Sequence, residues 1–119
     1  MVLDLTLLQA IDVTLGLKAE GWILINSPGE PPNLERFAGF RLAFVDATRI
    51  ALRHQLGTRT HPIVNTAVMG AFARVHGMPP LAAMVSAIEE EIAYKQDENI
   101  RAAEDAYHEV RMLDSVRVA

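Results

Sequence analysis

RLAFVDATRIA, the stretch at residues 41–51, decides the fold of this chain. It begins with a continuous apolar run from Leu42 to Val45, which is typical of a strand covered on both faces. The run stops at Asp46, and helix-forming residues follow directly. A strand that turns straight into a helix is the repeating unit of α/β proteins. The stretch therefore predicts an α/β domain.

A similar strand pattern occurs once more upstream. Residues 22–26 form an apolar run with β-branched and aromatic side chains, and a Pro/Gly-rich loop follows at residues 27–33. Residues 1–3 are short, apolar and extended in character, and Asp4 or Thr6 can cap a helix after them. Two good strands and the tail of a third are therefore expected.

Helices are predicted for the rest of the chain. The apolar periodicity indicates them at residues 46–56, from 63 or 64 to 76, at 81–94 and at 97–112. Two parallel strands are not stable alone in water, and their outer edges would be open to pairing. We therefore expect an incomplete Rossmann-like parallel sheet with flanking helices, completed by residues that this chain does not contain.

Composition excludes several classes of protein. The net charge of −4 argues against a nucleic-acid platform built on a basic face. The chain has no cysteine, so it can form neither a disulfide nor a thiolate-ligated iron–sulfur cluster. No apolar run approaches the roughly 20 residues that span a bilayer, and no secretory signal is visible. A cytoplasmic protein is expected.

Two polar residues stand at the carboxyl ends of the predicted strands. Asp46 and Asn26 occupy the place where open α/β sheets bind ligands. An Asp at this position also caps the helix that follows, and we favour the cap. Asn26 is open to the same two interpretations.

A third candidate region is the helix at residues 65–73, NTAVMGAFA. Asn65, Thr66 and Gly70 could line a site at its N-terminus. Alternatively, its Gly and Ala residues let a neighbouring helix approach closely, and we favour this interpretation. The four histidines are scattered, and no phosphate-binding glycine loop occurs, so neither a metal site nor a catalytic residue is predicted.

Five elements of the chain, taken in order, resemble one enzyme family. They are VLDLTLL at residues 2–8, GWILINS at 21–27, DATRIA at 46–51, NTAVMGA at 65–71, and a final group made of AIE at 87–89, EN at 98–99 and YHE at 107–109. This order is similar to the γ subunit or γ domain of 2-oxoacid:acceptor oxidoreductases, of which pyruvate:ferredoxin oxidoreductase is the best known. The resemblance implies a single partial γ-type domain over residues 1–119, with a helical C-terminal segment at 81–119.

The chain departs from the family at its start. The family's domain usually begins earlier, with a strand, a G-x-G-G-Q-G turn and further β–α units, which are absent here. Two explanations stay open: another polypeptide supplies this N-terminal half-domain, or Met1 is an internal methionine. Any role of that turn cannot be carried over.

The resemblance implies a role in oxidative decarboxylation of a 2-oxoacid, with coenzyme A taking the acyl group. The complex would use thiamine diphosphate, Mg²⁺ and [4Fe–4S] clusters held mainly on thiamine-binding and ferredoxin-like subunits. This chain would hold no cofactor and act mainly at interfaces. Asn26, Asp46, Asn65 or Thr66 would contribute contacts to the coenzyme A or substrate channel. Pyruvate, 2-oxoglutarate, branched-chain and aryl 2-oxoacids are all used in the family.

Two other functions remain open from the residues alone. One is a stand-alone nucleotide-binding or regulatory α/β module without catalysis, and the other is a remnant that assembles only with partners. The absence of a phosphate-binding turn speaks against the first.

Overall fold

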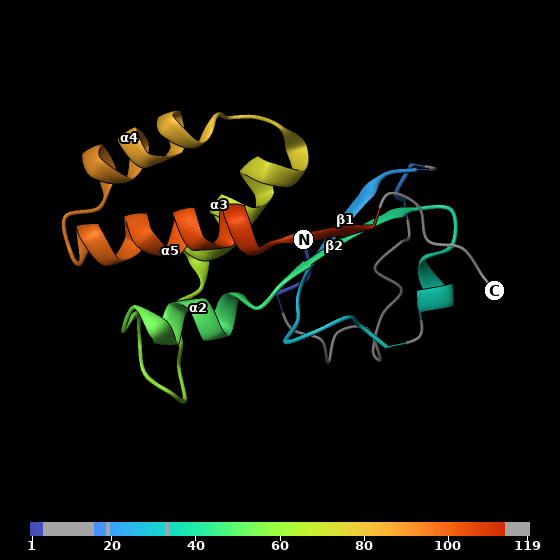
Figure 1. Cartoon of the computed structure of the whole chain (residues 1–119), viewed down its shortest axis with the longest axis horizontal. Coiled ribbons are helices and arrows are strands. Elements are labelled where there is room, and N and C mark those ends of the chain that lie inside the picture. Colours follow the sequence, from blue (N-terminus) through green and yellow to red (C-terminus); the bar gives the residue numbers. More distant parts are fainter. Residues whose placement is uncertain (4–15, 19, 33, 114–119) are drawn as a thin grey trace.

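A computed structural model describes residues 1–3, 16–18, 20–32 and 34–113. In Figure 1 the strands gather at one end of the molecule and the helices at the other. The elements are β1 (Trp22–Asn26), η1 (Leu34–Phe37), β2 (Arg41–Val45), α2 (Ala47–Arg53), α3 (Asn65–His76), α4 (Leu81–Glu91), α5 (Gln96–Glu109) and β3 (Arg111–Leu113). The helix predicted after Asp4 or Thr6 lies outside the described residues. The α/β class and both predicted strands are confirmed.

The sheet is mixed, with strand order β1-β2-β3. β1 and β2 are parallel, with Trp22 opposite Arg41 and Asn26 opposite Val45. β3 is antiparallel to β2. The helix predicted at residues 97–112 is confirmed as α5, but its end was wrong: α5 ends at Glu109, and the chain turns into β3. The segment at 81–119 is thus not helical throughout, and this chain supplies a third strand of its own.

The other edge of β1 is bridged by Val2. The Val2 N–H donates to the Leu24 carbonyl at 2.7 Å, and the Asn26 N–H donates to the Val2 carbonyl at 2.8 Å. This parallel bridge, between Val2 and Ile25, confirms the extended character predicted for the first residues.

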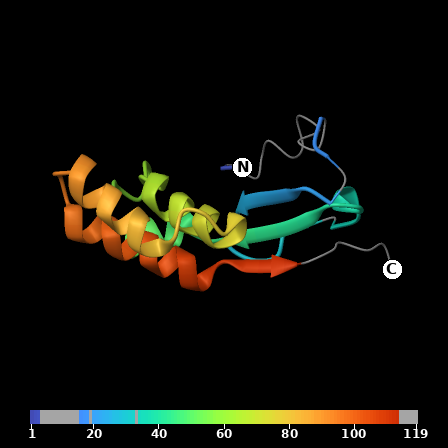
Figure 2. The same cartoon turned by 90° about the horizontal axis from the view of Figure 1, so that it is seen from above.

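Both faces of the two parallel strands are buried. On one face, Leu24, Ala43 and Val45 join a core with side chains of α2, α3 and α5. On the other, Ile23, Ile25 and Leu42 pack with Val2 and Phe37. Figure 2 shows the helices as a group that continues from the strand ends and leads back into β3. The continuous apolar runs in the sequence reflect this double burial.

Two predicted helix ends need correction. The helix predicted at residues 46–56 is α2, which ends earlier, at Arg53, because Gln55 takes a left-handed φ of 57°. The helix predicted to reach residue 94 ends at Glu91, after which Ile92 is extended. α3 ends as expected, with Gly77 as a left-handed C-cap.

The small residues of α3 lie against α5. A Cβ added at Gly70 would collide with the backbone of Ala103. Ala71 of α3 and the α5 residues Ala102, Ala103 and Ala106 are fully buried. The interpretation that we favoured, a close helix contact, is confirmed.

Gly70→Ala is expected to destabilise the chain. Overpacking typically costs about 1–3 kcal/mol, and the gain in helix propensity from Gly to Ala returns about 1 kcal/mol. Gly29→Ala is the matched control, because its added Cβ would meet nothing within 4 Å. Urea unfolding of the three proteins measures the difference. A Gly70→Ala protein that is more stable than Gly29→Ala by about 1 kcal/mol, the full gain in helix propensity, would show that α5 can move away from α3 at no cost.

Candidate functional site

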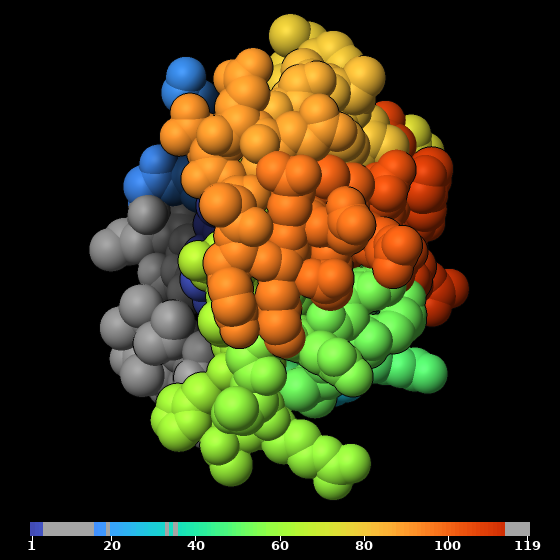
Figure 3. Space-filling model, turned by 90° about the vertical axis from the view of Figure 1, so that its left-hand side faces the viewer, coloured from blue at the N-terminus to red at the C-terminus, as the bar shows by residue number. Residues whose placement is uncertain are grey.

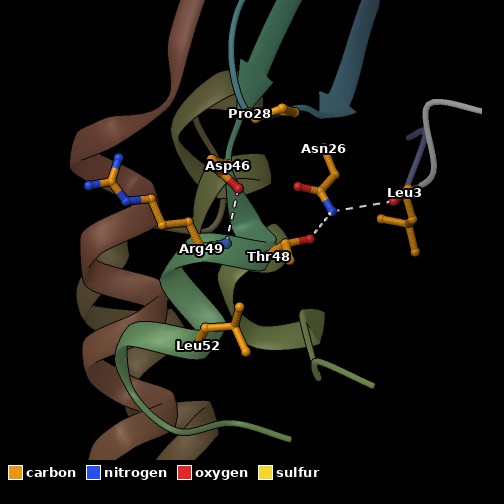
Figure 4. A pocket seen from close by; sticks show the side chains of 7 residues that line it. All are labelled: Leu3, Asn26, Pro28, Asp46, Thr48, Arg49 and Leu52. Carbon is orange, nitrogen blue, oxygen red and sulfur yellow. Dashed lines mark hydrogen bonds between the residues drawn. The ribbon is translucent and has the colours of Figure 1, made fainter. Parts of the chain in front are cut away.

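The main candidate site is a hollow at the carboxyl ends of β1 and β2, beside the start of α2 (Figure 4). Its volume is about 540 Å³. It is lined by Leu3, Asn26, Pro28, Asp46, Thr48, Arg49 and Leu52. The parallel arrangement of β1 and β2 places Asn26 and Asp46 at the same edge of the sheet, as the sequence predicted.

Asn26 connects three parts of the chain. Its side-chain oxygen accepts the Ala47 N–H at 2.9 Å. Its side-chain nitrogen donates to Thr48 Oγ1 at 3.0 Å and to the Leu3 carbonyl at 3.3 Å. The amide therefore joins the end of β1 to the N-terminal stretch and to the first turn of α2 (Figure 4).

Asp46 is the N-cap of α2. Its Oδ1 accepts the Arg49 N–H at 3.0 Å, which satisfies a donor that the helix leaves free in its first turn. The capping interpretation is confirmed. Asn26 and Asp46 thus share the capping of α2, each taking a different backbone N–H.

The far end of α2 is fixed by a cluster of charged side chains on α5. Arg53 contacts Glu109 with two nitrogens, at 2.6 and 3.3 Å, and Asp105 at 3.0 Å. His54 Nε2 lies 2.6 Å from Asp105 Oδ2. The hydrogen bond to Glu109 raises the pKa of Arg53 further above its usual range. α2, which carries three lining residues of the hollow, is therefore held at both ends.

Asp105 shows two opposing effects on its pKa. Partial burial alone would raise the pKa of its carboxyl, but hydrogen bonds from His54 and Arg53 outweigh burial and lower it below its ordinary value. The ionised form of Asp105 is thus favoured in the folded chain.

The hollow combines apolar walls with a few polar groups. Leu3, Pro28 and Leu52 give it apolar walls, while the exposed Arg49 lies at its margin, with the guanidinium directed away from Asn26 and Leu3 (Figure 4). Asn26 and Asp46 are engaged in backbone and side-chain hydrogen bonds. Sequence reasoning missed Thr48 and Arg49 as lining residues, although both belong to the DATRIA stretch and follow the strand end within one helical turn.

Asn65 and Thr66 do not reach this hollow. They line a separate one of about 210 Å³ with Tyr94, Lys95 and Asn99. It lies at the end of the molecule seen in Figure 3, where the α4–α5 connection (orange) meets the α2–α3 loop (yellow-green). The four predicted site residues thus fall into two places.

Thr66 takes part in a buried polar contact between helices. Its hydroxyl donates to Asn99 Oδ1 at 2.8 Å, and the Asn99 side-chain nitrogen donates to the carbonyls of Tyr94 and Lys95. This network connects α3 to the start of α5.

Two further searches cover the described part of the chain. Within it, no three His, Asp or Glu side chains come together as metal ligands would. Of the helices described, none has the length and apolarity to cross a membrane.

Comparison with known proteins gives consistent matches along the chain. Residues 1–109 match the family model described as pyruvate ferredoxin/flavodoxin oxidoreductase. A "pyruvate/ketoisovalerate oxidoreductases common subunit gamma" of Pyrococcus furiosus is 39% identical over 118 residues, which is 96% of this chain and 62% of the relative. "Pyruvate synthase subunit PorC" of Methanocaldococcus jannaschii is 40% identical over 111 residues, covering 92% of this chain and 58% of the relative.

A solved structure resembles the fold. The crystal structure of pyruvate oxidoreductase subunit PORC from Thermotoga maritima superposes with a TM-score of 0.75 at 34% identity. The match covers 93% of this chain and 62% of that one. The chain therefore spans about three fifths of the length of these relatives.

Removing the two caps is expected to destabilise the chain. Asp46→Ala should cost about 1 kcal/mol, while Asp46→Asn, which keeps an oxygen for Arg49, should be mild. Asn26→Ala leaves the Ala47 N–H without its partner and should cost about 1–3 kcal/mol. Asn65→Ala, at an exposed Asn, is the control and should stay within about 0.5 kcal/mol. Thermal unfolding measures all four, and an Asn26→Ala protein as stable as the control would contradict this assignment.

The Asp105 cluster predicts a loss of stability in acid. Because the folded-state pKa of Asp105 is lowered, its contribution is present above the unfolded pKa of about 4 and is lost as the pH falls through the folded value. Urea unfolding between about pH 6 and 3 should therefore show a steeper decline for the wild type than for Asp105→Asn. Asp97→Asn, at an exposed carboxylate of α5, should follow the wild type. Parallel curves for Asp105→Asn and the wild type would contradict the prediction.

Proposed function

We propose that this chain, which belongs to the pyruvate ferredoxin/flavodoxin oxidoreductase family, is a γ-type subunit of a 2-oxoacid:acceptor oxidoreductase complex. The main support is the match of residues 1–109 to the family model. The solved PORC structure, whose match covers 93% of the chain, adds to it. The stand-alone nucleotide-binding or regulatory module has no comparable support.

The proposed role in this complex is structural and at interfaces. Without cysteine, the chain cannot ligate an iron–sulfur cluster through thiolates, so the clusters would lie on a ferredoxin-like subunit. Thiamine diphosphate and Mg²⁺ would lie on a thiamine-binding subunit. The complex would decarboxylate a 2-oxoacid oxidatively in the cytoplasm. No side chain of this chain would act as acid, base or nucleophile in that reaction.

The hollow beside α2 is the proposed contribution to the coenzyme A or substrate channel. Asn26 and Asp46 would shape its wall by fixing the first turn of α2. The exposed Arg49, whose guanidinium points away from Asn26 and Leu3 (Figure 4), would pair with an anionic group such as a coenzyme A phosphate at the margin of the hollow. Asn65 and Thr66, which line the second hollow, would contact the channel only where a partner subunit extends it to that end of the molecule.

Kinetics of the assembled complex test the channel. Arg49→Ala should raise the KM for coenzyme A by roughly tenfold, as expected for losing one charge-assisted hydrogen bond, and leave the melting temperature unchanged. Arg49→Lys should restore part of the affinity. Arg101→Ala, at an exposed residue of α5, is the control.

The outcomes separate the alternatives. A raised KM for the 2-oxoacid instead would assign the hollow to the substrate path. Unchanged KM values for both would remove the hollow from the channel. Failure of the chain to purify with a thiamine-binding subunit would overturn the proposed function itself.

A further inference from the structure

Two arginines of α2 lie one helical turn apart but are bound differently. Arg53 is engaged with α5, because its guanidinium contacts Glu109 at 2.6 and 3.3 Å and Asp105 at 3.0 Å. Arg49, four residues earlier, is exposed and forms no ion pair within the described part of the chain. It is the arginine at the margin of the hollow (Figure 4). One arginine is thus tethered to α5, while the other has its guanidinium open to solvent.

Glu109 lies within reach of both arginines. Residues four apart on a helix are neighbours on its surface, with Cβ atoms about 5–6 Å apart, so Arg49 and Arg53 project from the same face of α2. The pairing of Arg111 with Phe44 also places the end of α5 beside the end of β2, where α2 begins. Distance alone therefore does not explain why Glu109 contacts Arg53 and leaves Arg49 unpaired.

The explanation lies in how the carboxylates of α5 are occupied. Glu109 uses both of its oxygens on two nitrogens of Arg53, which is the arrangement in which a guanidinium holds a carboxylate most specifically. Asp105 contacts Arg53 and, at 2.6 Å, His54. Each carboxylate therefore already has a cationic partner or a histidine, and neither draws Arg49 away from the hollow.

We propose that Arg53 is a positioning residue, which occupies the carboxylates of α5 and thereby keeps the guanidinium of Arg49 available for an anionic ligand at the hollow. The inference rests on the function proposed above, because it takes the hollow to bind an anion. A phosphate of coenzyme A and the carboxylate of a 2-oxoacid both offer the paired oxygens that a guanidinium binds. Arg53 itself touches neither ligand.

Loss of the Arg53 guanidinium would redirect Arg49. Glu109 would be left without its partner, whereas Asp105 would keep His54. The released carboxylate of Glu109 would then compete with the ligand for Arg49. Because an exposed ion pair is weak, this competition should raise the KM of the anionic ligand by about two- to sixfold.

Kinetics of the assembled complex test the inference, with KM measured separately for coenzyme A and for pyruvate. Arg53→Ala should raise the same KM that Arg49→Ala raises, by about two- to sixfold, and leave kcat unchanged. Arg53→Ala combined with Glu109→Gln should return this KM to the wild-type value, because no carboxylate is released. Arg53→Lys, which keeps a cation beside Glu109, should stay near the wild type. Arg101→Ala, which removes a charge from an exposed position of α5, is the control.

Two further variants separate the capture of Arg49 from other effects. Glu109→Gln alone breaks the same contact between α2 and α5 but leaves no free carboxylate, so KM should stay unchanged. A raised KM would mean that the contact acts through the shape of α2, which would overturn the inference. Arg49→Ala combined with Arg53→Ala should have the KM of Arg49→Ala alone, because no guanidinium remains to be captured. Additive effects would show that Arg53 acts on the ligand through its own charge, which would also overturn it.

Failure of this inference differs from failure of the proposed channel. If Arg49→Ala raises a KM and Arg53→Ala does not, the hollow keeps its proposed role and the positioning role of Arg53 is wrong. If Arg49→Ala changes neither KM, the anion site and the positioning role are both wrong. A coordinated rise in the KM for coenzyme A identifies the anion as a phosphate, and one in the KM for pyruvate identifies it as a carboxylate.

Discussion

The close contact between α3 and α5 is the constraint on which the rest of the structure depends. At Gly70 the two backbones are so near that no Cβ fits between them. This proximity brings Thr66 within hydrogen-bond distance of Asn99. It also fixes the direction of the α5 axis. α5 then leads through Val110 into β3, which pairs with β2. One small residue in α3 is thus coupled to the third strand of the sheet.

α2 depends on the same framework. Its start is fixed by Asn26 and Asp46, which accept different backbone N–H groups. Its end is fixed by Arg53 and His54, which contact carboxylates of α5. The exposed ion pairs contribute little energy singly, but the two-nitrogen contact of Arg53 with Glu109 is directional. The hollow beside α2 therefore has a shape set by contacts to β1 and α5, elements distant in sequence.

Local sequence was enough for the features that local physics determines. The runs at β1 and β2, the Asp46 cap and the small residues of α3 each carry their own signal, and each was predicted. β3 was not, because three residues carry no periodicity of their own and form a strand only by pairing with β2. Similarly, the distance between Asn65 and Asp46 depends on the path of the α2–α3 loop. The Arg53 and His54 contacts join residues more than 50 positions apart, which no local pattern reveals.

Stability and assembly are connected through α3. The side of this helix that faces α5 carries small residues, among them Thr66 and Gly70, so it gains stability from close backbone approach rather than from the burial of large side chains. The large apolar side chains, Met69 and Phe72, lie on the opposite side. Burying them would add the hydrophobic free energy that the inner face does not provide, about 25 cal/mol for each Å² of apolar surface. A partner that covered this side would therefore stabilise the chain, so folding and incorporation into a complex would favour each other.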